Sequence, residues 1–145
     1  MTDISTFADL SARDHGLCVL NTLRGDGSIQ SSVVNAGVMP HPETGEPVVA
    51  LVAIGSTRKL RNLRADPRTS VVAHAGWQWL TVEGTAEVIG PDDTDAETLR
   101  VLLRNVFTAA GGTHDDWDTY DRVMREEGRA AVLITPTRAY SNPAR

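Results

Sequence analysis

The chain has 145 residues, a length that suits one domain with its own hydrophobic core. Its apolar fraction is ordinary, which argues against a disordered chain, and no apolar run approaches the roughly 18 residues of a membrane span. The net charge of −5 argues against a general nucleic-acid or membrane-surface binder. The single cysteine, Cys18, excludes an intramolecular disulfide. Together with an N-terminus that has no signal-peptide pattern, it predicts a cytoplasmic location.

The first half of the sequence predicts a short helix followed by three strands. Ser5 is expected to cap the helix, with Phe7, Leu10 and Leu17 facing inward. The sequence Gly25-Asp26-Gly27 is a turn signal between two apolar, β-branched runs, and this pattern predicts a hairpin. The predicted strands span residues 17–23, 28–39 and 48–54, and the last is a continuous apolar run typical of a buried strand.

The second half predicts three more strands and three helices. A short helical pattern ends at Asp66-Pro67, and Thr94 with Glu97 forms a capping box that begins the next helix. Pro136 is expected to end the last strand. The predicted strands span residues 69–74, 77–89 and 130–135, and the final helix spans residues 115–127. Strands joined by hairpins and short loops, with few helices between them, predict a mainly β protein with an antiparallel barrel.

The segment with the strongest chemical signal runs from Ile54 to Asn62. A buried strand leads through Gly55 into a helix start, where free backbone N–H groups and the helix dipole attract anions. The segment adds two hydroxyl groups, two adjacent cations and an amide, from Ser56, Thr57, Arg58, Lys59 and Asn62. Lys59 is the only lysine among fourteen basic residues, and it offers a compact point charge. These residues predict a phosphate site; the alternative is a solvated basic helix with a serine cap.

Two polar residues and two tryptophans are candidate pocket walls. Gln30 and Ser32 on the second predicted strand either line a pocket or face water. Trp77 and Trp79 are two apart and therefore point to one side, as a wall for a flat ring or as core or dimer packing. The four histidines have no metal-ligand spacing, and the sequence contains neither a nucleophile elbow nor a phosphate-binding P-loop. No metal or hydrolytic site is therefore predicted.

Five pieces of the chain occur in an order and spacing that match a known family. They are the Leu20–Gln30 hairpin, the Ser56–Leu63 segment followed by Asp66-Pro67, the Trp77–Val88 strand with Glu83-Gly84-Thr85-Ala86, residues 114–120, and the closing strand that ends at Tyr140. In these pieces the sequence resembles the split β-barrel proteins of the pyridoxamine-phosphate-oxidase type, and among them the reductases that depend on the deazaflavin coenzyme F-420. The fold that this resemblance implies is one antiparallel split β-barrel domain over residues 1–145.

The resemblance also implies a homodimer whose cofactor sites lie in grooves between the subunits. The implied cofactor-binding residues are Gln30, Ser32, Ile54, Gly55, Ser56, Thr57, Arg58, Lys59, Asn62, Trp77 and Trp79. Among them, the 56–62 residues would contact the phosphate and ribityl tail, and Gln30 and Ser32 would approach the ring. The two tryptophans would come from the partner subunit or from the pocket wall. No catalytic side chain is expected, because the cofactor carries the redox chemistry.

The chain departs from the family pattern at two places. Related reductases can carry an arginine two positions before the lysine, where this chain has Thr57, with Arg58 adjacent instead. Residues 141–145 also contain no extended basic segment of the kind that pyridoxine-phosphate oxidases use, so oxidation of vitamin B6 is not expected.

Three functions remain open from the sequence. The first is a reductase that uses reduced F-420 to deliver a hydride to an electron-poor organic acceptor, such as a quinone, an enone or a tetrapyrrole. The second is an FMN-binding oxidase or flavin reductase of the same fold, and the third is a non-catalytic F-420- or flavin-binding protein. Arg61, Arg64 and Arg68 would suit the acidic polyglutamate tail of F-420, and they favour the first function.

Overall fold

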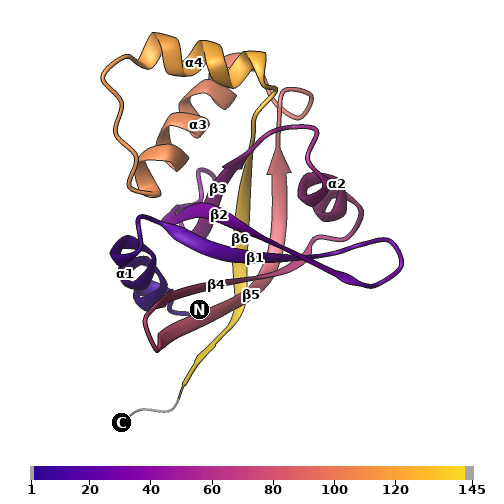
Figure 1. Ribbon diagram of the computed structural model, residues 1–145. Coiled ribbons are helices and arrows are strands. Elements are labelled where there is room, and N and C mark those ends of the chain that lie inside the picture. Colours follow the sequence, from indigo (N-terminus) through magenta and orange to yellow (C-terminus); the bar gives the residue numbers. More distant parts are fainter. Residues whose placement is uncertain (1, 143–145) are drawn as a thin grey trace.

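The computed structural model describes residues 2–142, so the last three residues of the C-terminal segment 141–145 lie outside it. Within this range, six antiparallel strands close into a barrel in the order β1-β2-β3-β6-β5-β4 (Figure 1). The strands are β1 (Leu17–Leu23), β2 (Ile29–Pro40), β3 (Pro47–Ala53), β4 (Arg68–Ala75), β5 (Gln78–Ile89) and β6 (Ala130–Ser141). The helices are α1 (Ser5–Arg13), α2 (Arg58–Ala65), α3 (Ala96–Ala109) and α4 (Trp117–Glu126). The predicted antiparallel barrel is confirmed.

The barrel interior is filled by alternate residues of each strand, as the pleat of a strand requires. Leu20, Val34, Leu51, Val71 and Val82 are all buried there, in one cluster with the residues that α1 contributes. Those residues are Phe7 and Leu10, joined by Ile4 at the N-cap position of α1. The short N-terminal helix therefore closes one end of the barrel.

Strand β3 is buried on both faces, which explains its continuous apolar sequence. Val49 and Leu51 point into the barrel, whereas Val48 and Ala50 point outward into a second cluster beneath α3 and α4. Leu99, Leu102, Leu103, Val106 and Tyr120 cover this outer face. In Figure 1, α3 and α4 form a separate layer above the barrel. None of the helices described for residues 2–142 has the length and apolar character needed to cross a membrane.

The helix starts differ from their predicted capping. Ile4 occupies the N-cap position of α1, and Asp3 Oδ1 accepts the backbone N–H of Ser5 at 2.9 Å. Helix α3 begins one residue later than predicted, because Asp95 takes the N-cap position and accepts the N–H of Thr98. Leu17, expected to face inward beside the first helix, belongs to β1 and is 40% exposed.

Pro136 does not end the final strand, which continues to Ser141. The pairing of β6 with β3 stops at Ile134. On that side of β6, no strand lies opposite Pro136, so its lack of a backbone N–H donor costs no hydrogen bond between strands. On the other side it lies opposite Gly84, where the β5–β6 register shifts between Glu83 and Gly84. A strand tolerates proline at such an irregularity of register. The sequence alone does not reveal the position of this irregularity.

Candidate functional site

The loop between β3 and α2 forms a tight turn held by a close backbone approach. The backbone N–H and the hydroxyl of Thr57 both donate to Ile54 O, at 3.1 and 2.9 Å. A Cβ added to Gly55 would lie 2.3 Å from Gly128 O, so a larger residue would force the two chain segments apart. Gly55 therefore sets the position from which α2 begins.

The N-terminus of α2 has no side-chain cap. Thr57 occupies the N-cap position, but its hydroxyl is used within the turn, and the first turn of α2 contains no acidic residue. By contrast, Asp95 and Asp116 cap α3 and α4. The exposed Ser56 lies beside the start of α2. Uncapped N–H groups and the positive end of the helix dipole make this end of α2 suited to an anion.

Three cations remain available around this helix start. Arg58 and Arg61 are exposed and Lys59 is half-buried, and none of the three forms an ion pair with any residue in the described range 2–142. The other two arginines of the basic segment are already paired. Arg64 binds Asp93 through two hydrogen bonds of 3.1 and 2.8 Å, and Arg68 binds Asp66 through bonds of 3.0 and 2.7 Å.

These two ion pairs alter the charge expected from the sequence. The Arg64 guanidinium holds the pKa of Asp93 below its usual range, and Arg68 does the same to the pKa of Asp66. Both carboxylates are therefore charged at neutral pH, and they neutralise their arginines. Of the three arginines expected to attract an acidic cofactor tail, only Arg61 keeps an uncompensated charge.

Asn62 lies on the inner side of α2, away from solvent. The side chain is 5% exposed, and Nδ2 donates to Thr22 Oγ1 at 3.0 Å and to Gln30 Oε1 at 2.9 Å. Asn62 therefore ties α2 to the β1–β2 hairpin. It is not turned outward on the face of Lys59 as a free phosphate ligand.

The same hydrogen bonds bring Gln30 to the helix that carries Lys59. Ser32, two residues along β2, is half-buried and lies on the same face of the strand as Gln30. The structure thus places the β2 residue Gln30 beside α2, the helix that directly follows the 54–57 loop. Two supporting residues of this site, Thr22 and Gly128, carry no clear signal in the sequence. Thr22 lies two residues after Leu20 on β1, so its side chain points into the barrel as that of Leu20 does. Gly128 has a positive φ of 58°.

Trp77 and Trp79 do not join this group within one chain. Trp77 lies in the turn before β5, not within the strand as predicted, and its side chain is 93% exposed. Trp79 is half-buried, with its ring packed edge-on against Tyr140 at a centroid distance of 6.3 Å. The β4–β5 turn lies at the opposite end of its hairpin from α2 (Figure 1). Within one chain, both tryptophans therefore lie away from the residues around the start of α2.

Comparison with known families decides what kind of barrel this is. The sequence profile of the pyridoxamine 5'-phosphate oxidase family matches residues 8–142, nearly the whole chain. The chain belongs to this family. Its six-strand barrel with flanking helices is the fold of such proteins.

Solved structures similar to this family member share its fold at low sequence identity. A conserved hypothetical protein from Mycobacterium tuberculosis is 22% identical, with a TM-score of 0.68, and the match covers 97% of this chain and 84% of that one. A protein described as an F-420 reductase is 17% identical, with a TM-score of 0.59 and coverage of 86% and 88%. An FMN-binding, pyridoxamine 5'-phosphate oxidase-related protein from Nostoc punctiforme is 11% identical, with a TM-score of 0.64 and coverage of 97% and 84%. A protein described as an F-420 reductase and a protein described as FMN-binding thus share this fold.

Proposed function

We propose that this chain is an oxidoreductase that uses reduced coenzyme F-420 to transfer a hydride to an electron-poor small organic acceptor of the quinone, enone or tetrapyrrole type. The observation that carries the proposal is the uncapped start of α2, with Ser56, Arg58 and Lys59 grouped around it. Charged donors and free backbone N–H groups at one helix start suit a phosphate monoester or diester. Membership of a family named for an oxidase supports redox chemistry at this site.

The residues present suit a phosphate-bearing flavin or deazaflavin. Lys59 and Arg58 would hold the phosphate, and Gln30, whose amide is oriented by Asn62, would face the ring together with Ser32. When bound, the ring supplies the hydride chemistry. This chain's own residues anchor the tail and fix the position of the ring.

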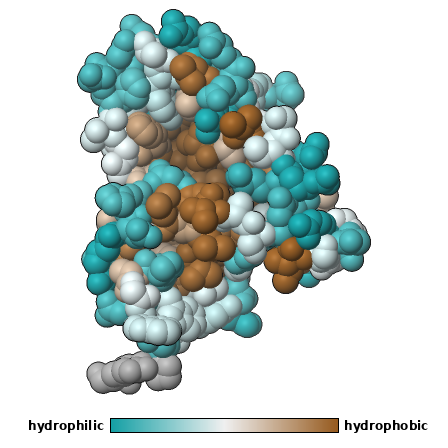
Figure 2. All heavy atoms as spheres, in the orientation of Figure 1, coloured by the Kyte–Doolittle hydropathy of each residue, from teal (hydrophilic) through white to brown (hydrophobic). Residues whose placement is uncertain are grey.

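We also propose that the protein acts as a homodimer that pairs through the outer face of the barrel. One row of outward side chains crosses five strands in register, because Tyr140 pairs with Thr81, Thr81 with Val72, Val72 with Val19, and Val19 with Val33. Val33 is 66% exposed. Figure 2 shows apolar atoms gathered over the middle of the barrel. The two ends of the row, Val33 and Tyr140, are exposed, and exposed apolar side chains gathered on one face favour a protein interface.

The neighbouring polar row on this face is already hydrogen-bonded within the chain. Ser31 Oγ donates to Asn21 Oδ1 at 2.6 Å, and Asn21 Nδ2 donates to Ser70 Oγ at 3.0 Å. These bonds lower the cost of covering the row with a second copy. Trp79 also points outward from the same sheet face, so a second copy would be the source of any tryptophan at the cofactor groove.

A cytoplasmic, reducing location completes the proposal. Cys18, the only cysteine of the chain, is a free thiol buried in the barrel interior.

FMN is the second candidate cofactor, and one observation favours it. Arg64 and Arg68 are held by Asp93 and Asp66, so the chain offers fewer free cations for a polyglutamate tail than its sequence suggests. An FMN-binding oxidase or flavin reductase would need only the phosphate anchor.

A visible spectrum followed by two titrations distinguishes these functions. We expect purified protein without bound flavin, tighter binding of F-420 than of FMN, and oxidation of reduced F-420 when menadione is added. A yellow protein that retains FMN would overturn the F-420 proposal in favour of FMN. Binding of F-420 without oxidation across a panel of quinones, enones and tetrapyrroles would identify a non-catalytic binding protein. The chromophore of F-420 without phosphate and tail serves as the matched ligand control, and it should bind more weakly.

A further inference from the structure

A cavity of about 490 Å³ lies between α3, α4 and the loop that follows β5. Its apolar walls consist of Pro91, Ala96, Leu99, Leu103 and Met124. The volume falls within the range of about 300–1,000 Å³ that is usual for small-molecule sites. Met124 gives the wall an adaptable, polarisable side chain of the kind that accepts ligands of varied shape. None of the residues proposed to hold the cofactor lines this cavity.

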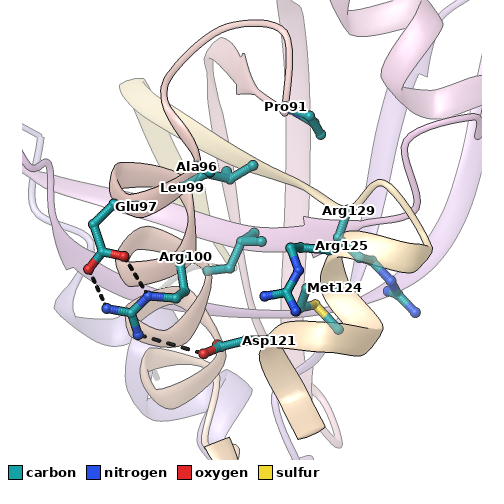
Figure 3. Close-up of a pocket in the computed structure, with 10 residues that line it drawn as sticks. Pro91, Ala96, Glu97, Leu99, Arg100, Asp121, Met124, Arg125 and Arg129 are labelled. Atoms are coloured by element: carbon teal, nitrogen blue, oxygen red, sulfur yellow. Dashed lines mark hydrogen bonds and ion pairs between the residues drawn. The ribbon is translucent and has the colours of Figure 1, made fainter. Parts of the chain in front are cut away.

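The charged groups around the cavity are mostly neutralised by one another. Figure 3 shows Glu97 and Arg100 on the α3 side and Asp121 between the two helices. Arg100 Nε donates to Glu97 Oε2 at 2.9 Å, and Arg104 Nε donates to Asp121 Oδ1 at 2.9 Å. Arg100 Nη1 also lies 3.6 Å from Asp121 Oδ2. Two arginines and two carboxylates thus form a network with no net charge.

Arg129 and Arg125 supply the remaining charges, and only one of them is compensated. Arg129 pairs with Glu127 at 3.2 Å. Arg125 lines the cavity from α4, beside Met124 (Figure 3), and pairs with no acidic residue between positions 2 and 142. The cavity therefore combines apolar walls with one uncompensated positive charge.

We propose that this cavity binds a monoanionic amphiphile, a molecule with one carboxylate on an aliphatic or ring body, with Arg125 as its anionic anchor. A charge-assisted hydrogen bond to a guanidinium fixes the carboxylate. The apolar body would cover the side chains of Leu99, Leu103 and Met124. A polyanion such as a nucleoside triphosphate is a poor match, because Arg125 is the one cation of the described cavity lining that no acidic residue compensates.

Titration calorimetry with decanoate tests the proposal, with decanamide as the uncharged ligand of the same length. We expect the wild-type protein to bind decanoate, and decanamide at least about fivefold more weakly. Because Arg125 is exposed to solvent, Arg125→Gln should weaken decanoate binding by about fivefold and leave decanamide binding unchanged. Arg122→Gln is the matched control, since Arg122 lies on α4 but does not line the cavity and pairs with Glu126.

A second variant, Ala96→Phe, fills the cavity without changing its charge. Ala96 is exposed at the first position of α3 and lines the cavity, so the larger ring has space to enter. It should abolish binding of both ligands. Equal affinity for decanoate and decanamide, or unchanged binding in Ala96→Phe, would overturn the proposal. So would loss of decanoate binding in Lys59→Ala, because the ligand would then occupy the cofactor site. No binding to the wild type, together with a weaker dimer in Ala96→Phe, would show that a second copy covers the cavity, which also overturns it.

Discussion

Asn62 on α2 donates its side-chain amide to Gln30 Oε1 on β2, at 2.9 Å. The same Nδ2 atom donates to Thr22 Oγ1, and none of the buried side-chain polar atoms described for residues 2–142 lacks a partner. This relationship couples the helix that carries Lys59 to the strand that carries Gln30. The two parts of the candidate site, the proposed phosphate anchor on α2 and the proposed ring wall on β2, are therefore linked by a direct hydrogen bond.

Replacing Asn62 should uncouple these two parts. In Asn62→Ala, Thr22 Oγ1 and Gln30 Oε1 lose a common donor in a buried position, so the free energy of unfolding should fall by about 1–3 kcal/mol. Cofactor affinity should fall as well, because the Gln30 amide is no longer oriented, although Lys59 is intact. Urea unfolding and a cofactor titration measure the two effects. Asn105→Ala, which changes an exposed asparagine on α3, is the control and should alter neither.

Much of the fold could be predicted because its signals are local. The apolar run of β3 predicted a buried strand, and the structure buries it on both faces, with the barrel core on one side and α3 and α4 on the other. The expectation that Pro136 ends the last strand was wrong. A proline is tolerated within β6 because the pairing with β3 stops at Ile134, and this end of the pairing is not visible in the local sequence. The prediction that Trp77 lies in a strand was wrong. Its large apolar side chain is typical of a strand, but the turn at Gly76, whose φ is 61°, includes Trp77 as well.

The candidate site was only partly accessible from the sequence, for a similar reason. Loop and helix-start chemistry around Ser56 and Lys59 is local, so it could be recognised along the chain. The pairing of Arg64 with Asp93 joins residues 29 positions apart, and no periodicity reveals it. Asn62 was expected to contact the phosphate together with its neighbours in the chain, whereas its hydrogen-bond partners come from the distant β1–β2 hairpin.

A charge in the outer apolar row should prevent dimer formation. Val33 is 66% exposed in the single chain, so Val33→Asp should leave the fold of the monomer intact. In a symmetric dimer the substitution places two carboxylates in the interface, and such an arrangement costs several kcal/mol. Sedimentation velocity should show a dimer for the wild type and a monomer for the variant. Val101→Asp on α3, where the valine is 43% exposed, is the matched control and should remain dimeric. A dimer that persists in Val33→Asp would place the interface elsewhere.

Asp121 should make stability depend on pH in the acid range. The hydrogen bonds from Arg104 hold the pKa of this carboxyl below its usual value of about 3.9. A carboxyl whose pKa is lowered on folding stabilises the native state above its unfolded pKa, and this contribution is lost as the pH falls through the folded pKa. Asp121→Asn should therefore be less stable than the wild type at neutral pH, by about 1–3 kcal/mol, with the difference shrinking below pH about 4.

Urea unfolding at a series of pH values measures this difference. Asp118→Asn, which changes an exposed carboxyl on the same helix, is the control and should run parallel to the wild type. If the gap between Asp121→Asn and the wild type stays constant down to low pH, the carboxylate of Asp121 does not stabilise the fold through its charge.

Lys59 should act on the phosphate and not on the ring. Lys59→Ala removes the ammonium group of a half-buried residue beside the uncapped start of α2, and a charge-assisted contact of this type is worth about 1.5–3 kcal/mol when fully shielded from water. Because Lys59 is partly solvated, we expect the affinity for a phosphate-bearing cofactor to fall by about tenfold. Riboflavin, which has the FMN ring and ribityl chain but no phosphate, should bind the variant and the wild type equally. Fluorescence titrations with FMN, F-420 and riboflavin measure these affinities, and Arg122→Ala on α4 is the cation control. An equal loss for riboflavin would mean that Lys59 acts through the fold, and an unchanged affinity for all three ligands would remove it from the site.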